Sequence, residues 1–342
     1  MILVTGATGL LGSYLISALL KRGEKVRALR RSSTDMRMLQ KVLSYQSENP
    51  EALFSAIEWL EGDVCDVYSL EEAMKGISQV YHCAGIVSFE PRFREMMMNT
   101  NVRGTANVVN AALHCGIDKL CHVSSVAALS RTEADEVIDE NSTWKPSGHN
   151  SVYAVSKYNG EREVWRGMEE GLNAVIVNPS IIIGYAGNNS GSSQLFSTID
   201  ACSWFYSNGV NGFIDVRDVA SCMITLTNSD ISGKRFVLSA ENLSYRQLFI
   251  FIAAQLEKKL PFIRAGNGLL SLVWRIEKLR SLLLRSQPMI TMETVNTQKN
   301  RYFYNNNAIK QATGINFIPI EESISYFCSK YSADKPWFHC RE

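Results

Sequence analysis

A glycine-rich turn directly follows the first strand-like segment of the chain. The apolar run Met1–Val4 leads into Thr5-Gly6-Ala7-Thr8-Gly9-Leu10-Leu11-Gly12, and a helical pattern then continues to about Arg22-Gly23. Gly6 permits the tight turn, Gly9 lets backbone amides approach a pyrophosphate, and Gly12 allows the helix to pack closely on the strand. Because the flanking segments match on both sides, the turn predicts a dinucleotide-binding site. We expect this site to be lined by Gly6, Thr8, Gly9, Leu10 and Leu11.

Short apolar segments alternate with helix-length segments through the first half of the chain. They are apolar on consecutive rather than alternate positions, as in strands buried on both faces of a parallel sheet. The sequence therefore predicts an α/β fold with a doubly wound, parallel Rossmann sheet and a smaller C-terminal substrate-binding lobe. The expected strands are Met1–Val4, Val26–Leu29, Ile57–Leu60, Val80–Cys83, Leu120–Val123 and Val175–Val177.

The alternation weakens after Pro179, where Gly184–Ser193 form a loop rich in Gly, Asn and Ser. We expect strands near Phe213–Val216 and Arg235–Leu238 to return to the sheet. The expected division is 1–184 with 212–239 for the NAD(P)-binding Rossmann domain, and 185–211 with 240–330 for the substrate-binding lobe.

Composition narrows the class of protein. The chain has 342 residues, 46% of them hydrophobic, and a net charge of +1 without clustered Lys and Arg, which argues against a nucleic-acid surface. Its eight cysteines are scattered and include no Cys-x-x-Cys pair, and no secretory leader precedes Met1–Val4, so we expect a cytoplasmic protein. The apolar stretch Gly268–Leu284 is interrupted by four charges and does not predict a membrane span. We expect an amphipathic helix over the substrate pocket, with a membrane-surface anchor as the alternative. No metal site is expected, because the neighbours Cys121 and His122 would point to opposite faces of a strand.

The end of the second expected strand bears on the choice of cofactor. An acid at this point binds the ribose 2′-hydroxyl of NAD, but the chain reads Val26-Arg27-Ala28-Leu29-Arg30-Arg31-Ser32. Two guanidiniums there would bind a 2′-phosphate, so Arg30 and Arg31 favour NADP over NAD. In the alternative interpretation one arginine stacks on adenine and the other is solvated. We further expect Asp63-Val64 near the adenine and Ala84-Gly85 near the adenosine ribose.

Three polar residues form the expected catalytic site. Tyr153 and Lys157 are four residues apart, so on a helix the ammonium lies beside the phenol and favours its ionised form. Ser125 follows the fifth expected strand and would emerge at the same carboxyl edge. Tyr326 with Lys330 and Tyr331 with Lys335 share the spacing but lie outside the alternating region, and we assign them to a helix surface.

Tyr153, Ser125 and Lys157 would have different roles around the substrate oxygen. Tyr153 would exchange a proton with a carbonyl or alcohol, and Ser125 would hydrogen-bond that oxygen. Lys157 would lower the phenol pKa and hold the nicotinamide ribose, while the nicotinamide carries the hydride. His149 is a further candidate for substrate contact or proton relay, although a solvated loop position is the simpler interpretation. The aromatics Trp204, Phe205 and Tyr206 line either a substrate pocket or a packed core.

The combination of Thr-Gly-x-x-Gly-x-x-Gly, a Ser after the fifth strand and Tyr-x-x-x-Lys closely resembles the extended short-chain dehydrogenase/reductases, which are the NAD-dependent epimerase/dehydratase family. The segments Asn101-Val-Arg-Gly-Thr105, Asn178-Pro179-Ser180 and Val216-Arg217-Asp218-Val219-Ala220 are also similar to family segments. The resemblance implies that Pro179 and Ser180 border the nicotinamide and that Asn101 braces the site. It also implies a possible homodimer through the helices near 96–116 and 153–171.

The resemblance favours one branch of the family. The run Val26–Arg31 and the segment His122–Ala128 look more like the dihydroflavonol reductase branch than like the nucleotide-sugar enzymes. Epimerases of nucleotide sugars commonly grip the substrate diphosphate with an arginine where this chain has Asn211, and that departure disfavours such a substrate.

Three functions remain open from the sequence. The first is an NAD(P)-dependent oxidoreductase that transfers a hydride between nicotinamide and a ketone, aldehyde or secondary alcohol, a small-molecule substrate, with Tyr153 as general acid/base. The second is a nucleotide-sugar epimerase or dehydratase with bound NAD. The third is a non-catalytic NADP-binding sensor, which would have little need for Ser125, Tyr153 and Lys157.

Overall fold

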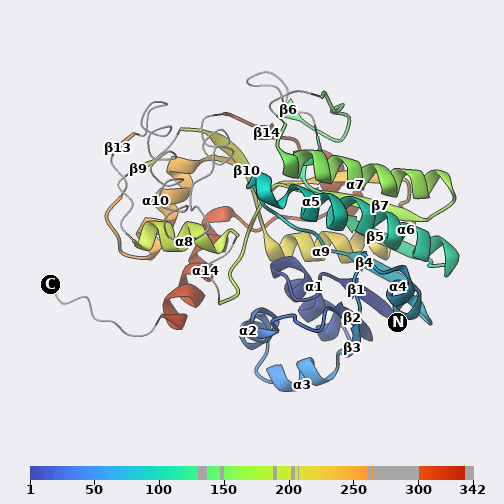
Figure 1. Ribbon diagram of the computed structural model, residues 1–342. Coiled ribbons are helices and arrows are strands. Elements are labelled where there is room, and N and C mark those ends of the chain that lie inside the picture. Colours follow the sequence, from blue (N-terminus) through green and yellow to red (C-terminus); the bar gives the residue numbers. More distant parts are fainter. Residues whose placement is uncertain are drawn as a thin grey trace.

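A seven-stranded parallel sheet forms the centre of the molecule. The computed structural model describes residues 1–129, 137–146, 150–187, 191–201, 205–206, 208–260, 263–264 and 300–335. The strand order is β11-β7-β5-β4-β1-β2-β3, with all pairings parallel (Figure 1). This is the predicted doubly wound α/β fold. The strands are β1 (Ile2–Thr5), β2 (Val26–Arg30), β3 (Glu58–Glu61), β4 (Gln79–His82), β5 (Lys119–Val123), β7 (Ala174–Pro179) and β11 (Lys234–Leu238).

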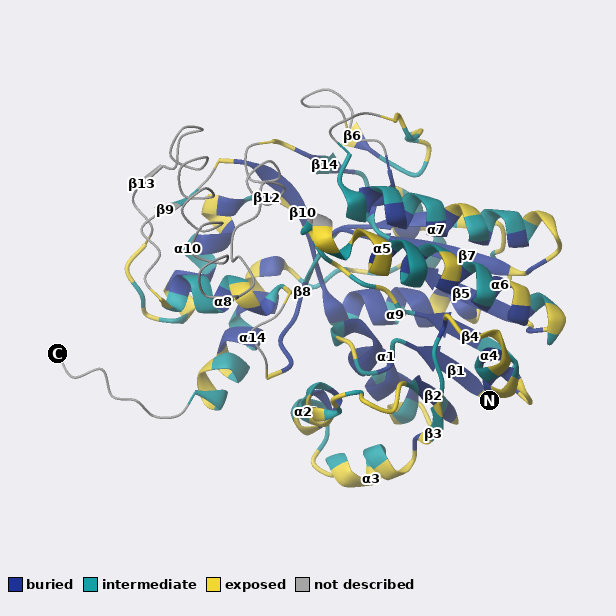
Figure 2. Ribbon diagram, viewed as in Figure 1, coloured by how far each residue is buried: buried dark blue, intermediate teal, exposed yellow. Residues whose placement is uncertain are grey.

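Helices cover both faces of this sheet, which explains the consecutive apolar residues of its strands. In β1, Ile2 and Val4 belong to one buried cluster and Leu3 to the other, so the strand is buried on both sides (Figure 2). One face carries α1 (Leu10–Lys21), α2 (Arg37–Gln46), α3 (Pro50–Ser55) and α9 (Val216–Thr227), and the other carries α4 (Val67–Met74), α6 (Thr105–His114) and α7 (Val152–Glu169).

A π-helical turn joins the segment after β4 to helix α6. The chain runs through η1 (Pro91–Phe93), α5 (Arg94–Met97) and the π-helical η2 (Met98–Gly104). Helix α7 lies against this turn, because a Cβ at Gly160 would fall 2.2 Å from the carbonyl oxygen of Asn101. The glycine therefore permits a close approach that a larger side chain would prevent. Single π-turns of this kind occur frequently at functional sites.

A separate three-stranded sheet corrects one expectation from the sequence. The order is β12-β10-β8, formed by β8 (Ile181–Ile183), β10 (Val210–Asp215) and β12 (Glu241–Ser244). The strand expected at 213–216 therefore does not return to the large sheet, whereas the one expected at 235–238 does so as β11. The physical reason is that β11 occupies the free edge of β7, which leaves β10 to pair with β8 and β12.

The remaining elements lie around these two sheets. Strand β14 pairs in parallel with β6, so residues from the C-terminal part of the chain hold the segment that follows β5. Helices α8, α10 and α14 pack together beside β10 and β12 (Figure 1). The bounds are η3 (Val126–Ala128), β6 (Val137–Ile138), α8 (Ser193–Asp200), β9 (Phe205–Tyr206), α10 (Tyr245–Gln255), β13 (Ile263–Arg264), β14 (Phe303–Tyr304), α13 (Asn307–Thr313) and α14 (Ile320–Asp334).

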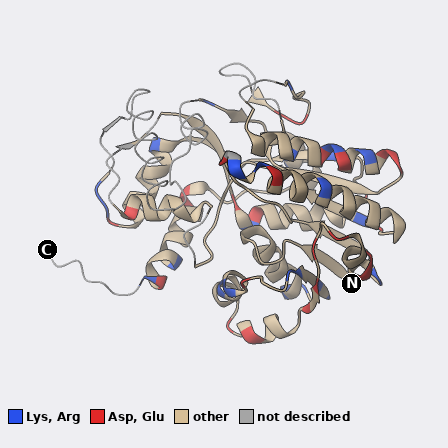
Figure 3. Cartoon of the chain, viewed as in Figure 1, with Lys and Arg blue, Asp and Glu red and all other residues tan. Residues whose placement is uncertain are grey.

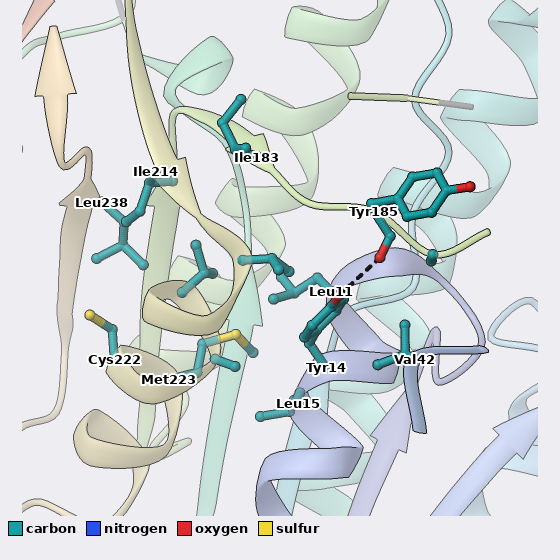
Figure 4. Close-up of a cluster of buried hydrophobic side chains, with 14 of the residues drawn as sticks. Leu11, Tyr14, Leu15, Val42, Ile183, Tyr185, Ile214, Cys222, Met223 and Leu238 are labelled. Atoms are coloured by element: carbon teal, nitrogen blue, oxygen red, sulfur yellow. Dashed lines mark hydrogen bonds between the residues drawn. The ribbon is translucent and has the colours of Figure 1, made fainter. Parts of the chain in front are cut away.

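One apolar core connects helix α1 with the segments that leave the large sheet. Leu11 and Tyr14 on α1 pack with Ile183 and Met223 in the same buried cluster (Figure 4). The Tyr14 hydroxyl donates a hydrogen bond of 2.9 Å to the carbonyl oxygen of Tyr185. The start of α1 is thus anchored on its buried side, which matters because its N-terminus forms part of the candidate site.

The surface of the described residues is mixed in charge. Basic and acidic residues are interspersed along the outer helices (Figure 3). Within the ranges given above, no helix combines the length and apolar character needed to cross a bilayer. The amphipathic helix expected over Gly268–Leu284 lies outside the described residues.

A buried carboxyl in α9 makes stability depend on pH. Asp218 is 5% exposed, and burial raises the pKa of this carboxyl to about 6 although it accepts a hydrogen bond from the Ile318 amide at 2.8 Å. The folded state therefore holds the proton more tightly than the unfolded state, and stability falls as pH rises from about 4 to 6.

We expect Asp218→Asn to raise the free energy of unfolding by about 1 kcal/mol at pH 8, with the gain disappearing by pH 4. The full pKa shift of Asp218 corresponds to a larger free energy than this. Part of the gain is lost because the side-chain amide of the asparagine accepts a weaker hydrogen bond from Ile318, and because the substitution removes a negative charge that stabilises the N-terminus of α9. Urea unfolding at pH 4, 6 and 8 measures this, with the exposed Asp230→Asn as control. A stability that is lower than wild type at pH 8 would contradict the assignment.

Candidate active site

The predicted glycine turn brings the carboxyl ends of β1 and β4 together. Gly6 has φ +67°, and a Cβ at this residue would lie 2.5 Å from the amide nitrogen of Ala84. Gly12 is equally constrained, since its Cβ would lie 2.2 Å from the Gly6 carbonyl oxygen. The Thr5 hydroxyl accepts a hydrogen bond from the Ala84 amide at 3.3 Å and pairs with His82 Nδ1 at 2.7 Å. Any side chain at Gly6 or Gly12 would force strand, turn and helix apart.

The N-terminus of α1 is suited to an anion. Gly9 is the N-cap residue, so no side chain caps the helix, and its first turn contains no acidic residue. Gly9 is exposed, and Thr8 and Leu10 are half-buried. The side chain of Leu11 is buried in the core, so only its backbone can contact a ligand. Unpaired backbone amides and the positive end of the helix dipole are the groups that hold a pyrophosphate. The turn therefore fits a dinucleotide.

The two arginines at the end of β2 differ in their surroundings. The Arg30 guanidinium lies 5.8 Å from the ring centre of Trp59 on β3, a cation–π contact. Arg31 is exposed, and its backbone forms a short turn in which its carbonyl oxygen accepts from the Thr34 amide and its own amide donates to the Thr34 hydroxyl. Both arginines stand at the carboxyl edge of the sheet, where open α/β sheets bind ligands.

The residues after β3 and β4 reach the same edge. The Asp63 carboxylate accepts from the Cys65 amide at 2.9 Å, and Val64 is buried with its carbonyl oxygen accepting from Asn107. Gly85 lies close to helix α7, because a Cβ there would be 3.7 Å from Lys157 Nζ and 3.4 Å from Asn101 Oδ1. The expected cofactor loop and the expected catalytic lysine are therefore neighbours.

Lys157 is buried at the centre of the site. Its Nζ donates a hydrogen bond of 2.8 Å to the Val123 carbonyl oxygen at the end of β5. Burial lowers the pKa of Lys157 to about 8, and the negative charge of Glu161 opposes that shift. A lysine has three donor hydrogens, so two remain for other partners. The ammonium is thus held at the carboxyl edge between β4 and β5.

Tyr153 lies one helical turn before Lys157 on α7. The helix begins at Val152 after Ser151, whose hydroxyl accepts from the Ala154 amide at 3.0 Å, so the cap fixes where Tyr153 stands. The Tyr153 ring meets the ring of Phe89 edge to face, with centroids 5.8 Å apart. Phe89 is 41% exposed, which leaves an apolar side chain open to solvent beside the tyrosine.

Ser125 and Asn101 complete the polar surroundings of this helix. The Ser125 Oγ accepts from the Ala127 amide at 3.1 Å and its carbonyl oxygen accepts from Asn178 at 3.0 Å. Asn101 sits in the π-helical η2, where its amide group accepts from the Ile86 amide at 2.7 Å and donates to Ser156 Oγ at 2.9 Å. Asn101 thereby connects the loop after β4 to α7.

The segment after β7 runs under this region. Pro179 and Ser180 are buried, and the Ser180 Oγ is a buried hydroxyl with no protein hydrogen-bond partner among the described residues. A Cβ at Gly212 of β10 would lie 2.9 Å from Ser180 Cβ, so β10 passes close to the residue that joins β7 to β8. Asn211 is 5% exposed and accepts from the Gly212 amide.

Glu161 on α7 is a buried carboxylate beside the site that the sequence did not indicate. Glu161 is 2% exposed and accepts from Ser124 Oγ at 2.6 Å and from Asn178 Nδ2 at 2.7 Å. The signal available was its spacing, four residues after Lys157 on the same helix face, but such pairs are ordinary on exposed helices. Phe89 was missed for a similar reason, since a loop aromatic has no fixed partner in the sequence.

Other candidates from the sequence lie elsewhere. Lys330 is 5.2 Å from the ring centre of Tyr326, and Lys335 is 4.7 Å from that of Tyr331. Both tyrosines belong to α14, which packs against α10. Tyr206 stacks under Arg246. His149 and Trp204, and the side chain of Phe205, lie outside the described residues.

The sheet order and the glycine turn define a Rossmann-type dinucleotide-binding protein. Residues 2–239 match the NAD dependent epimerase/dehydratase family, so the chain belongs to this family and the resemblance inferred from its motifs is confirmed. It is 30% identical over 249 residues to sterol demethylase protein B of Methylococcus capsulatus, covering 72% of this chain and 71% of that protein.

Reductases are prominent among the similar proteins. A putative dihydroflavonol 4-reductase of Synechocystis sp. is 28% identical over 330 residues, covering 94% of this chain and 92% of that protein. Cinnamoyl-CoA reductase 1 of Petunia hybrida is 28% identical over 253 residues, covering 71% and 73%.

Solved structures share the architecture over nearly the whole chain. The crystal structure of gox2253 superposes with a TM-score of 0.79 at 26% identity, covering 97% of this chain and 98% of that one. The Bordetella bronchiseptica enzyme WbmG, in complex with NAD and UDP, superposes with a TM-score of 0.73 at 19% identity, covering 97% and 94%, and shows a common fold.

Proposed function

We propose that this protein is an NADP-dependent reductase or dehydrogenase acting on a ketone, an aldehyde or a secondary alcohol. The observation that carries the proposal is the position of Lys157. Its ammonium is buried beside Gly85 of the expected cofactor loop and lies on the same helix face as Tyr153. Burying an ammonium away from water costs free energy. Buried ionisable groups with shifted pKa values are common in active sites, where the chemistry requires them.

The residues of the chain divide the proton chemistry among them. Tyr153 donates a proton to the substrate oxygen during reduction and accepts it during oxidation. Ser125 accepts a hydrogen bond from the Ala127 amide through Oγ, which leaves its hydroxyl hydrogen to donate to the same substrate oxygen. The Lys157 ammonium favours the ionised form of the phenol. When bound, the nicotinamide supplies or accepts the hydride.

Two features support a carbonyl substrate over a nucleotide sugar. The reductase relatives cover the greater part of this chain, whereas the nucleotide-sugar relationship rests on solved structures under 20% identical. Asn211 stands where many nucleotide-sugar enzymes carry an arginine, and it is buried and neutral here. The Rossmann part, 1–184 with 212–239, would hold NADP, and the remaining lobe would select the substrate.

The arginines at the end of β2 provide the first test. We expect Arg30→Ala/Arg31→Ala to weaken NADPH binding by about ten- to hundredfold, because hydrogen bonds to a charged group contribute about 1.5–3 kcal/mol. NADH binding should stay the same, since NADH has no 2′-phosphate. Titration calorimetry with both cofactors measures the change, and each single variant shows which arginine is responsible.

Arg22→Ala is the matched control, because Arg22 is exposed at the opposite end of α1. Wild-type protein that binds NADH as tightly as NADPH would contradict the NADP assignment, and nucleotide sugars would then be screened first. Consumption of NADPH with carbonyl compounds separates the two chemistries, because an epimerase returns its cofactor to the starting oxidation state.

A further inference from the structure

Glu161 is a buried carboxylate with four hydrogen-bond donors. In addition to Ser124 and Asn178, Arg235 on β11 donates to Oε1 at 3.0 Å and Trp165 donates at 3.2 Å. The Arg235 side chain is 19% exposed and that of Glu161 3%. A buried pair of this kind contributes little to net stability, so we looked for another role of this carboxylate in its contacts.

Two of the donors of Glu161 lie beside residues of the candidate site. Ser124 precedes Ser125 at the end of β5, and Asn178 precedes Pro179 at the end of β7. The same Asn178 Nδ2 also donates to the Ser125 carbonyl oxygen at 3.0 Å. One carboxylate on α7 therefore connects the segment carrying Ser125 with the end of β7, where Pro179 lies, through bonds of 2.6 and 2.7 Å.

Glu161 also acts on Lys157 by charge. It stands one helical turn after the lysine and favours its cationic form, against the burial that disfavours it. The other titratable groups around Lys157 add little charge. Burial holds the pKa of His82 at about 3 and that of His122 well below its usual range, and it raises the pKa of the Cys83 thiol, so all three are neutral.

We propose that Glu161 is a positioning residue that fixes the segment of Ser125 to the end of β7 and places a negative charge one helical turn from Lys157. The inference rests on the proposed function of Tyr153 and Lys157. Arg235 holds the carboxylate in place from the other side and is itself held, since it donates to the carbonyl oxygens of Glu140 at 2.8 Å and Ser142 at 3.1 Å.

The test is the titration of Lys157 itself, which needs no substrate. Protein labelled with ¹³C at lysine Cε is titrated by NMR, and the Lys157 signal is assigned with Lys157→Arg. We expect Glu161→Gln to lower the titration midpoint of Lys157 by about one pH unit. This is the lower end of the range of pKa shifts caused by a nearby opposite charge. Glu163→Gln is the matched control, because Glu163 lies on the same helix but pairs with Arg166 at the surface.

A merely structural role predicts the opposite sign. If Glu161 only held the loops together, its loss would admit water and raise the Lys157 midpoint toward that of a solvated lysine. Arg235→Gln distinguishes loss of the Glu161 charge from loosening of the hydrogen-bond network, because it removes one donor of the network and keeps the carboxylate. We expect its midpoint to stay or rise, and an unchanged or raised midpoint in Glu161→Gln would overturn the proposal. If Glu161→Gln does not fold, a lowered midpoint in Arg235→Gln overturns it instead.

Kinetics then connect the charge to turnover. In Glu161→Gln the alkaline limb of the kcat profile should move down by the same interval, with NADPH affinity close to wild type. A wild-type protein that reduces no carbonyl compound would refute the proposed function while leaving the NMR titration as the test of Glu161. A lowered midpoint without any shift of the limb would overturn the link between Glu161 and Tyr153.

Discussion

Replacing Tyr153 by phenylalanine should lower kcat by about 10²–10⁴-fold, the range expected when a positioned acid or base is removed. NADPH affinity should remain close to wild type, because the phenol acts on the substrate oxygen and the phenyl ring that remains after the substitution would still pack against Phe89. Steady-state kinetics with a carbonyl substrate, together with cofactor titration, measure both quantities.

Tyr158→Phe is the matched control for this variant. Tyr158 lies on the same helix, and its ring stacks on Trp144 with centroids 4.4 Å apart, away from the position of Tyr153. This control should keep the wild-type kcat. If the Tyr153 variant also retained most of its activity, the proton would have to come from another group, and a non-catalytic cofactor-binding role would return to consideration.

Introducing a methyl group at Gly12 should weaken NADPH binding by at least about tenfold. The added Cβ would lie 2.2 Å from the Gly6 carbonyl oxygen and 3.0 Å from the Ala7 Cα, both backbone atoms that cannot rotate away. Helix α1 must then move off the turn, and the amides at its N-terminus move with it. A misplacement of about 1 Å can cost a well-aligned site about a hundredfold in rate, so we expect at least a tenfold loss of NADPH affinity here.

The measurement is cofactor titration beside thermal unfolding, so that loss of affinity is separated from loss of fold. Ser17→Ala on the same helix is the control, since it removes a buried hydroxyl that has no partner among the described residues and should leave affinity unchanged. A Gly12→Ala protein with both wild-type stability and wild-type affinity would show that the close contact of turn and helix is unnecessary.

Local patterns in the sequence were sufficient for the large sheet. Most strands of the first half contain short runs of consecutive apolar residues, and such runs fit a parallel sheet with helices on both faces. The strand at 210–215 could not be assigned in this way. It is also buried, and its place depends on competition with β11 for the edge of β7, which no local pattern encodes.

In the candidate site, too, local motifs predicted some residues and missed others. Glycines required by a turn and a tyrosine and lysine one helical turn apart have fixed spacing, so motifs were enough to propose them. Glu161 is different, because in the sequence it is one acid among 34. It stands out only through its burial and through donors just after β5, on β7 and on β11, which lie far apart along the chain.

The pairing of β14 with β6 limits how independently the parts of this protein can be exchanged. The residues that match the family end at 239, yet β10 takes its antiparallel partner from β12, and β6 takes its partner from β14. Glu140 and Ser142, just after β6, in turn hold Arg235 against Glu161. Replacing the residues after 239 by those of a relative would therefore disturb contacts that reach helix α7, so recombination between relatives is constrained to preserve this chain of contacts.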